Sequence, residues 1–505
     1  MWIPLIAFIV TTIAIAYLYM TRNFKHWTKK GVEEIKPRAF VGNLGNCLLM
    51  KISPGIFFKQ LYHETKGLPY VGLYLMDKPA LLIRDPGIIK RILIKDFNYF
   101  CDRYARAANN DSMGKSNLLM IQNPDWKKMR AKLTPIFTTG HLKKMFVLMQ
   151  EVGKDLDVYL ESQFSKENLC TLEIKEVCAK FTTDMIGTTA YGLKVNSLNN
   201  PDAEFRKHGR EIFSFSFKRS IELTTIFLIP GLVDILGSQF FSKESTKFLR
   251  DAFWDTINER MKSGVKRNDL IDLLIELKKS QENDPVQNNG FKFDGDNLVA
   301  QAAIFFTGGF ETSSTTMSFT FYELAINIEV QNKLRFEINE AIQANDGKIT
   351  YEMVMTLPYL DMVVSEILRM YPVLPYLDRV AQKNYNIPET NLLIEKGTAI
   401  IIPMLGLHGD PQYFPNPDVF DPERFSEENK KSLIPCVYMP FGEGPHICIG
   451  QRLGLLQSKL GIIHIISKYE LSINKKTSVP IKLNPKAVLT SAIDGIHLNL
   501  KKIII

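Results

Sequence analysis

The feature that most restricts the possible folds of this chain is a glycine-rich turn around one cysteine, at residues 440–450 (PFGEGPHICIG). Three glycines and two prolines surround Cys448, and an apolar segment that predicts a helix follows at once. A thiolate needs N–H donors and positive potential, and a helix N-terminus supplies both. Glycines also allow the backbone to approach a flat cofactor closely. The composition of this turn therefore points to Cys448 as a ligand in a cofactor site.

A lone cysteine before a helix is more often an inert buried residue, so the whole segment has to carry the argument. The pattern F-x-x-G-x-x-x-C-x-G is matched at Phe441, Gly444, Cys448 and Gly450. This pattern closely resembles the haem-binding loop of the cytochrome P-450 family, in which a cysteine thiolate ligates the iron and favours O–O cleavage. The resemblance implies that haem b is the cofactor and Cys448 its axial ligand, with Phe441 and Gly442 against the haem.

A second motif, Gly308-Gly309-Phe310-Glu311-Thr312, lies inside the longest predicted helix and resembles the oxygen-activation motif of the same family. Two glycines in mid-helix cost roughly 1 kcal/mol each, but they leave a groove for a flat ring, with Gly308 against the cofactor. The Thr312 hydroxyl can bond a carbonyl one turn earlier and loosen the helix. The resemblance implies that Thr312 and Glu311 are catalytic and deliver protons. The alternative is a packing contact beside a surface glutamate.

The family's E-x-x-R motif is matched by Glu366 and Arg369, which lie on one helical face at i, i+3 spacing. Arg424, in the segment PERF, matches the position that donates a second arginine to this pair. The resemblance implies a structural Glu–Arg–Arg network that holds the loop beneath the haem. The alternative is an ordinary surface ion pair, because E-x-x-R alone is common.

Fixed donors such as guanidinium and indole N–H groups suit buried carboxylates, and several of them match family positions that bind the haem propionates. Trp126 and Arg130 share a helical face at i, i+4 spacing, and Arg379 and His446 occupy further matching positions. Arg103 is the weakest match. These five residues are the expected propionate contacts.

Substrate-pocket residues are predicted from helical spacing. Ile304, Phe305 and Gly308 share the face of Thr312, so they are expected to line the pocket. Phe213 and Phe215 are expected to cap it, although aromatic helix positions are more often core.

Residues 2–20 carry no charged side chain, and a helix of this length spans roughly 28 Å, close to the ~30 Å hydrocarbon core. Arg22, Lys25, Lys29 and Lys30 follow directly. A cleaved signal peptide would carry its positive charge before the apolar run, so an uncleaved transmembrane signal-anchor at 1–21 is favoured. The basic cluster predicts a domain that faces the cytosol from the endoplasmic reticulum membrane. In that compartment the six cysteines are expected to be free thiols.

The remaining chain predicts a mainly α fold with a smaller β portion nearer the N-terminal half (α+β). The resemblance implies the cytochrome P-450 fold, with a long central helix over the haem. A basic tether at 22–45 is expected to lead into one haem-binding monooxygenase domain at 46–505. A β-hairpin is predicted at 70–74 and 80–83, a tight hairpin turn at 494–495, and a polar surface loop at 280–289. The predicted helices are 125–136, 142–164, 171–191, 205–217, 243–262, 297–327 (capped by Asp294 or Asp296), 359–370 and 450–468.

The net charge of +8 includes no dense basic patch, so nucleic acid is not an expected partner. No flavin or nicotinamide fingerprint is present, and this chain is not expected to bind flavin or NADPH. The resemblance implies a haem-thiolate monooxygenase that uses O2 as co-substrate and inserts one oxygen atom into hydrophobic small molecules, either xenobiotics or endogenous lipophilic compounds. Electrons are expected from NADPH through a separate flavoprotein reductase, with cytochrome b5 as an alternative donor. The reductase is expected to dock on the Cys448 side, near Lys127, Lys128 and Lys132.

Residues 100–103 and 181–201 look most like the insect microsomal branch associated with detoxification. Two other activities remain open from the residues alone. A haem-thiolate isomerase or dehydratase would need no external electrons, and the Glu311-Thr312 pair argues against it. A haem-binding sensor or carrier would show no turnover and no substrate-dependent consumption of NADPH.

Overall fold

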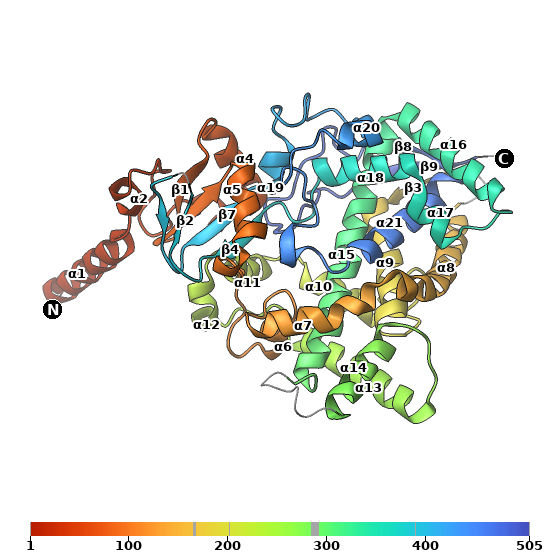
Figure 1. Cartoon of the computed structure of the whole chain (residues 1–505), viewed down its shortest axis with the longest axis horizontal. Helices are drawn as coiled ribbons and strands as arrows, with labels where there is room; N and C mark the ends of the chain where they lie inside the picture. Colours follow the sequence, from red (N-terminus) through yellow and green to blue (C-terminus); the bar gives the residue numbers. More distant parts are fainter. Residues whose placement is uncertain (1, 165–167, 201, 284–291, 389, 504–505) are drawn as a thin grey trace.

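The computed structural model describes residues 2–164, 168–200, 202–283, 292–388 and 390–503. It is 56% helical with 9% of residues in strands, which confirms the mainly α fold with a smaller β portion. Figure 1 shows the largest sheet at the end of the molecule from which the N-terminal helix projects, and most of the helices gathered beyond it.

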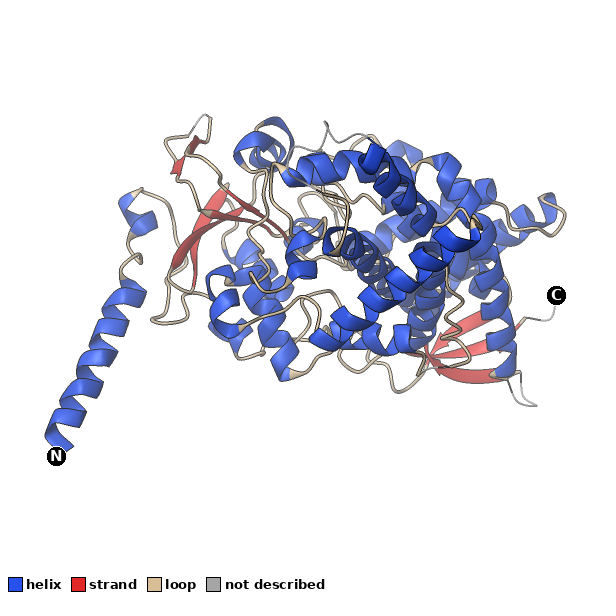
Figure 2. Ribbon diagram, turned by 90° about the horizontal axis from the view of Figure 1, so that it is seen from below, coloured by secondary structure: helices blue, strands red, loops and turns tan. Residues whose placement is uncertain are grey.

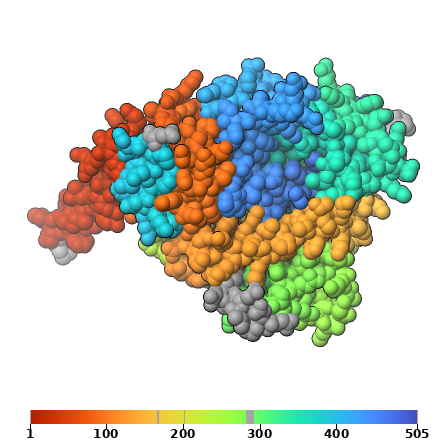
Figure 3. Space-filling view, viewed as in Figure 1, coloured from red at the N-terminus to blue at the C-terminus, as the bar shows by residue number. Residues whose placement is uncertain are grey.

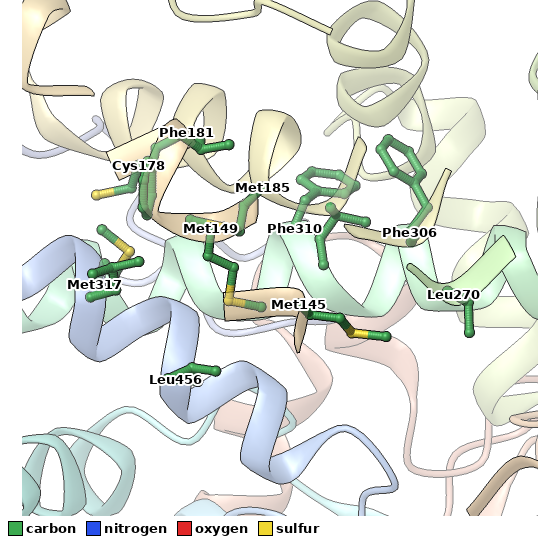
Figure 4. Packing of buried hydrophobic residues seen from close by; sticks show 14 of the residues in the cluster. Met145, Met149, Cys178, Phe181, Met185, Leu270, Phe306, Phe310, Met317 and Leu456 are labelled. Atoms are coloured by element: carbon green, nitrogen blue, oxygen red, sulfur yellow. The ribbon is translucent and has the colours of Figure 1, made fainter. Parts of the chain in front are cut away.

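The core is organised around the long helix α15 (Asp296–Ile326), as predicted. This helix is apolar on nearly every face, and such a helix is stable only when other elements surround it. It packs against α9 (Ile174–Ala190) and α21 (Gln451–Ile466). In Figure 4, Phe310 and Met317 of α15 lie among side chains of α9, α21 and α8 (Thr139–Ser162). The site described below lies along α15.

The other helices surround this core. They are α2 (His26–Lys29), α3 (Gly45–Leu48), α4 (Pro54–Glu64), α5 (Pro86–Lys90), α6 (Ser112–Ser116), α7 (Asp125–Leu133), α10 (Glu204–Ile212), α11 (Phe217–Leu228), α12 (Val233–Leu236), α13 (Lys243–Ser263), α14 (Leu270–Asn283), α16 (Ile328–Ala344), α17 (Tyr351–Thr356), α18 (Pro358–Met370), α19 (Met404–His408) and α20 (Glu427–Lys430).

Two predicted helices differ in kind from the structure, one because it begins as a strand and one because it is broken, and local capping explains both. The segment predicted as one helix at 171–191 begins as strand β3 (Leu169–Glu173), and the Glu173 carboxylate accepts the N–H groups of Lys175 and Glu176 where α9 starts. The segment predicted at 205–217 is broken between α10 and α11. The Ser216 hydroxyl accepts the Arg219 N–H at 3.2 Å and starts the second helix.

The predicted caps of the central helix are wrong. The N-cap position is Gly295, and neither neighbouring aspartate caps the helix. Asp296 binds the Arg250 guanidinium at 2.9 Å, and Asp294 binds Lys278 at 2.9 Å. The two carboxylates therefore join α15 to α13 and α14.

The largest sheet has the strand order β1-β2-β7-β4. Its first two strands form the predicted hairpin, with Tyr70 opposite Ile83 and Leu75 opposite Lys78. A second sheet has the order β3-β9-β8, and the two short strands β5 and β6 pair with each other. The strands are β1 (Tyr70–Leu75), β2 (Lys78–Ile83), β4 (Leu377–Val380), β5 (Tyr385–Asn386), β6 (Leu393–Ile394), β7 (Ala399–Ile402), β8 (Tyr469–Ile473) and β9 (His497–Lys502). The β portion therefore draws on both halves of the chain, not mainly on the first.

The predicted tight hairpin turn at 494–495 is wrong. These residues form a bend that leads into β9, whose partners are β3 and β8. The predicted loop at 280–289 begins inside α14, which continues to Asn283. The rest of that predicted loop, 284–289, lies outside the described residues.

The N-terminal helix α1 (Trp2–Thr21) has no buried residue and projects from the body of the molecule (Figure 2). Its length and mean hydropathy of 2.2 are sufficient to cross a membrane. All six cysteines are free thiols, as expected.

Candidate functional site

A cavity of about 310 Å³ lies between α15 and the cysteine turn. It brings together most of the predicted site residues, although they are far apart in the sequence. The predicted residues that line it are Arg103, Trp126, Arg130, Phe213, Ile304, Phe305, Gly308, Thr312, Arg379, Phe441, Gly442, His446 and Cys448. Of the residues predicted for proton delivery and for the substrate pocket, Glu311 and Phe215 do not line it, and neither do the residues of the predicted structural network, Glu366, Arg369 and Arg424. Phe215 lies between α10 and α11 and is 42% exposed, so it does not cap the cavity.

The cysteine turn is folded so that only glycine fits at two positions. Gly442 and Gly444 have φ values of +76° and +72°, a region that other residues rarely adopt. A side chain at Gly444 would also overlap the carbonyl oxygen of Leu93. The Cys448 N–H donates to the Phe441 carbonyl at 2.8 Å and closes the turn. The turn thus presents the Cys448 sulfur to the cavity, just before α21 begins.

The electrostatic surroundings of Cys448 contain opposing effects. Burial raises the pKa of the thiol above its usual value, and the Gly450 N–H and the guanidinium groups of Arg130 and Arg103 offset only part of this effect. The accessible surface of Cys448 faces the cavity that the residue lines. A cation bound in the cavity at the sulfur would stabilise the thiolate further.

The two glycines of α15 meet different surroundings. No atom lies within 4 Å of where a side chain would begin at Gly308, which faces the cavity. A side chain at Gly309 would overlap Ile186 of α9, so this glycine allows the two helices to pack closely. The Thr312 hydroxyl donates to the Gly308 carbonyl at 2.5 Å, the bond expected to loosen the helix at this point.

Glu311 is held away from the cavity by Lys175 of α9. The Lys175 ammonium lies 2.9 Å from the Glu311 carboxylate and also donates to Ser314 at 2.7 Å and Thr315 at 2.8 Å. Lys175 was not predicted from the sequence, because no local pattern links residues so far apart. The Glu311 carboxylate is therefore bound by Lys175 and does not line the cavity.

One end of the cavity is cationic, and the Asp378 carboxylate, 3.7 Å from the Arg103 guanidinium, balances only part of its charge. Arg379 is 1% exposed, and its Nε is buried without a hydrogen-bond partner, as is the Nε of Arg103. Burial, together with the nearby Arg103, lowers the pKa of Arg379 to about 9. Unfilled donors of this kind match a ligand that carries carboxylates. The cationic end therefore fits the propionates of the haem that the sequence implies.

His446, an expected propionate contact, lines the cavity and is bonded to the neighbouring chain. Its Nε2–H donates to the Cys101 carbonyl at 2.8 Å, and its ring lies against Trp126 with centroids 3.8 Å apart. Burial and the nearby Arg103 and Arg379 lower its pKa to about 2, so the imidazole is neutral. Its N–H is thus bonded to the protein in this structure, and the contact of His446 with a propionate stays a prediction.

The predicted Glu–Arg–Arg network is assembled behind the cysteine turn. Arg369 donates to both carboxylate oxygens of Glu366 at 2.7 Å, and Arg424 lies 3.4 Å from the same carboxylate. Arg369 also donates to the His408 carbonyl at 2.9 Å. The His408 ring accepts the Met439 N–H at 3.2 Å, next to the start of the cysteine turn. His408 was missed by sequence reasoning, and it links the network to the turn.

We expect His408 to make stability depend on pH. Burial, with a smaller effect of Arg369, lowers the pKa of His408 from 6.5 to about 3. The unfolded chain takes up a proton below pH 6.5, whereas the folded chain does not. The stabilisation is complete above pH 6.5 and falls by about 2 kcal/mol at pH 5. Urea unfolding of His408→Gln should show a flatter pH dependence than the wild type between pH 7 and 5, and equal slopes would contradict this role.

The other end of the cavity is apolar. Much of this apolar end is lined by residues that were not predicted from the sequence. They come from the segment after α6, from α11, from the segment before α13 and from two C-terminal segments. They are Leu118, Leu119, Leu223, Phe227, Phe240, Val373, Leu374, Val488 and Leu489. No charged side chain belongs to this apolar set. It suits a neutral hydrophobic ligand, because burying a charge without a partner is costly.

Comparison with known proteins agrees with this geometry. A family model described as Cytochrome P450 matches residues 36–499. The chain is similar to Cytochrome P450 6k1 of Blattella germanica, with 46% identity over 98% of this chain and 96% of that protein. It is also similar to Probable cytochrome P450 6g2 of Drosophila melanogaster, with 43% identity over 99% of both chains. Cytochrome P450 9e2 of Blattella germanica is 38% identical over 99% of this chain and 98% of that protein.

Proposed function

Because this chain belongs to the cytochrome P450 family of haem-thiolate monooxygenases, we propose that Cys448 is its axial haem ligand and that substrates bind in the apolar end of the cavity. The observation that carries the proposal is one cavity in which a cysteine sulfur lies between an apolar lining and two arginines, Arg103 and Arg379, whose buried Nε groups have no hydrogen-bond partner among the described residues. One oxygen atom from O2 enters a hydrophobic small molecule, either a xenobiotic or an endogenous lipophilic compound.

The residues that line the cavity have different roles. Arg103, Arg130, Arg379 and the Trp126 indole are placed to hold the haem propionates. Phe441 and Gly442 lie beside the sulfur and limit the access of water. The bound haem supplies electron transfer and dioxygen activation, with the thiolate favouring O–O cleavage. The protein positions the cofactor and keeps the substrate side apolar.

Protons for the reaction are assigned to Thr312 and Glu311. Thr312 lies on the cavity face of α15. Its hydroxyl can release its hydrogen bond to the Gly308 carbonyl and donate instead to a water or a reacting oxygen in the cavity. Glu311 lies on the side of α15 that packs against α9, where its side chain is 13% exposed and paired with Lys175, and it exchanges protons when it leaves Lys175. The pair thus places two proton-carrying groups at adjacent positions of α15, one of them at the cavity.

Reconstitution with an NADPH-dependent reductase tests the activity. We expect lipophilic substrates to shift the haem Soret band and to stimulate NADPH consumption with formation of an oxygenated product. Thr312→Val keeps the side-chain shape but removes the hydroxyl, so product per NADPH should fall by roughly one to two orders of magnitude while peroxide rises. Thr312→Ser should retain most of the coupling. Turnover that continues without O2 and NADPH would contradict the proposal.

Electrons come from a separate reductase, as is general in this family. We infer that a flavoprotein reductase docks on the face that exposes α7, with cytochrome b5 as a second donor. In Figure 3 the blue C-terminal segment lies at the centre of one face, bordered below by the orange segment that includes α7. Lys127 and Lys128 are exposed there. Lys132 is half-buried, with its ammonium over the Phe293 ring, which leaves it less able to meet a partner.

Reversing the charge of this face should weaken the reductase interaction. We expect Lys127→Glu with Lys128→Glu to lower kcat/KM for the reductase about tenfold at low salt, since complementary charges accelerate encounter. The difference should shrink at high salt. Lys475→Glu with Lys476→Glu, exposed beyond β8, provides the control with the same charge change. Equal salt dependence in both double variants would place the docking face elsewhere.

We further propose that α1 is an uncleaved anchor in the endoplasmic reticulum membrane and that the catalytic domain faces the cytosol. The apolar composition of α1 and the cations Arg22, Lys25, Lys29 and Lys30 after it support this orientation. The proposed organisation is an anchor at 1–21, a basic tether at 22–45 and one monooxygenase domain at 46–505.

A further inference from the structure

Four consecutive carbonyl groups of α15, at residues 308–311, each accept a hydrogen bond from a side chain. The donors, in the order of these carbonyls, are Thr312 at 2.5 Å, Gln457 at 2.6 Å, Thr182 at 2.9 Å and Ser314 at 3.0 Å. Thr312 and Ser314 belong to α15 itself, whereas Gln457 lies on α21 and Thr182 on α9. Figure 4 shows these two helices packed against α15. The turn that carries the predicted oxygen-activation motif is therefore bound by side chains from two other helices.

Gln457 is the donor from another helix that is fully committed to this turn. Its side chain is buried, and its amide nitrogen donates to the Gly309 carbonyl and also to the Ser313 hydroxyl. The amide oxygen of Gln457 is buried and has no hydrogen-bond partner among the described residues. A carbonyl oxygen only accepts, so the amide nitrogen must face Gly309. The Thr182 hydroxyl, by contrast, also reaches the Cys178 carbonyl of its own helix at 2.9 Å. Both donors of Gln457 are therefore used on one turn of α15.

A second donor weakens the bond that a helical carbonyl makes within its own helix. In a regular α-helix the Gly309 carbonyl accepts the N–H of Ser313. The Gln457 amide competes for the same oxygen, and a side chain that enters the hydrogen-bond ladder in this way bends or opens a helix. Gly309 also lies against Ile186 of α9, so the backbone is confined on that side. The turn is thus loosened but held in place, and the position of Thr312, next to Ser313, depends on it.

The helix that carries Gln457 also follows the cysteine turn. It begins at Gln451, directly after the turn that presents Cys448 to the cavity, and Gln457 lines the same cavity. From these contacts we propose that Gln457 is a positioning residue, which fixes the Thr312 hydroxyl relative to the Cys448 sulfur and keeps it free to donate into the cavity. The Thr182 hydroxyl assists it from α9. The inference rests on the role in proton delivery proposed above for Thr312.

Removal of the Gln457 amide should uncouple the reaction without weakening substrate binding. Gln457→Met keeps the length of the side chain but has no donor for the Gly309 carbonyl. In the haem-loaded chain with reductase, and with 7-ethoxycoumarin as a neutral lipophilic probe, product per NADPH should fall roughly tenfold and peroxide should rise, because a small displacement of a reacting group is costly. KM should be unchanged, because the apolar end of the cavity is not altered.

Amide hydrogen exchange distinguishes this role from ordinary packing. If the Gln457 amide competes for the Gly309 carbonyl, its removal strengthens the bond within α15. The Ser313 N–H of haem-loaded Gln457→Met should then exchange about tenfold more slowly than in the wild type. A contact that only packed the two helices together would give the opposite result, because its loss exposes the backbone and speeds exchange.

Gln331→Met is the matched control. Gln331 of α16 is also fully buried, and its amide donates to the Leu324 carbonyl near the end of α15 at 2.8 Å. Its loss should lower the free energy of unfolding but leave the exchange of Ser313 and the product per NADPH unchanged. Uncoupling in this variant too would assign the effect to a general loss of stability and overturn the inference. The carbon monoxide spectrum verifies that each variant retains the haem.

Thr182→Val tests the same competition if Gln457→Met does not retain the haem. It keeps the side-chain shape, and the Ser314 N–H, the partner of the Phe310 carbonyl in a regular helix, should exchange more slowly. Equal or faster exchange at these N–H groups, or unchanged product per NADPH, would overturn the inference. A Thr312→Val variant that stays fully coupled would instead overturn the proton role of Thr312 in the proposed function.

Discussion

Replacement of Cys448 by serine is expected to remove the red-shifted absorption of the ferrous carbon monoxide complex and to reduce monooxygenase turnover to the limit of detection. Serine retains nearly the same volume, so the turn can still close through the Cys448 N–H and the Phe441 carbonyl. The hydroxyl is a much weaker ligand for iron than a thiolate, and it does not promote O–O cleavage in the same way. The measurement is the difference spectrum of the reduced protein, followed by product formation with reductase.

Cys101→Ser is the matched control for this substitution. Cys101 is half-buried near the same end of the cavity, and its backbone carbonyl accepts the His446 N–H. Its side chain does not line the cavity. This variant should therefore keep the red-shifted band and most of the turnover. If Cys448→Ser retained the band while Cys101→Ser lost it, the axial ligand would have been assigned to the wrong cysteine.

Features encoded by contiguous residues were predictable from the sequence. The cysteine turn carries its glycines, its aromatic residue and its ligand within one short segment, and the helices α15, α18 and α21 follow from long apolar patterns. The predicted hairpin of β1 and β2 was also correct, because the two strands are joined directly. In each of these cases the interacting groups are close in the sequence.

Features that depend on distant partners were not predictable. Strand β9 pairs with β3, more than three hundred residues earlier, and this pairing decides that residues 494–495 form a bend and not a hairpin turn. Lys175 reaches Glu311 only because α9 packs along α15. The N–H of His446 is occupied by the Cys101 carbonyl, which no pattern around His446 reveals. Tertiary contacts of this kind change the role of a residue without changing its motif.

Removal of Arg369 is expected to have the largest effect on folding. Glu366 is fully buried, so Arg369→Met leaves a buried carboxylate whose remaining partners are Arg424, at 3.4 Å, and the Asp421 N–H, at 3.1 Å. Breaking a buried pair in this way costs about 3–5 kcal/mol. That is a large part of the roughly 5–15 kcal/mol that stabilises an ordinary domain. The free energy of urea unfolding should fall by this amount, and the haem should be lost at a lower denaturant concentration.

A double substitution separates the cost of the unpaired charge from the value of the pair. Arg369→Met with Glu366→Met removes both buried charges, so it should be more stable than Arg369→Met alone, although it still lacks the bond to the His408 carbonyl. Lys430→Met breaks the exposed pair with Asp361, 2.8 Å apart, and should cost no more than about 1 kcal/mol. A double variant no more stable than Arg369→Met would show that Arg369 acts mainly through its bonds to backbone carbonyls. In that case the network would hold the cysteine turn through His408 and Met439, and the carboxylate would serve only to orient the arginine.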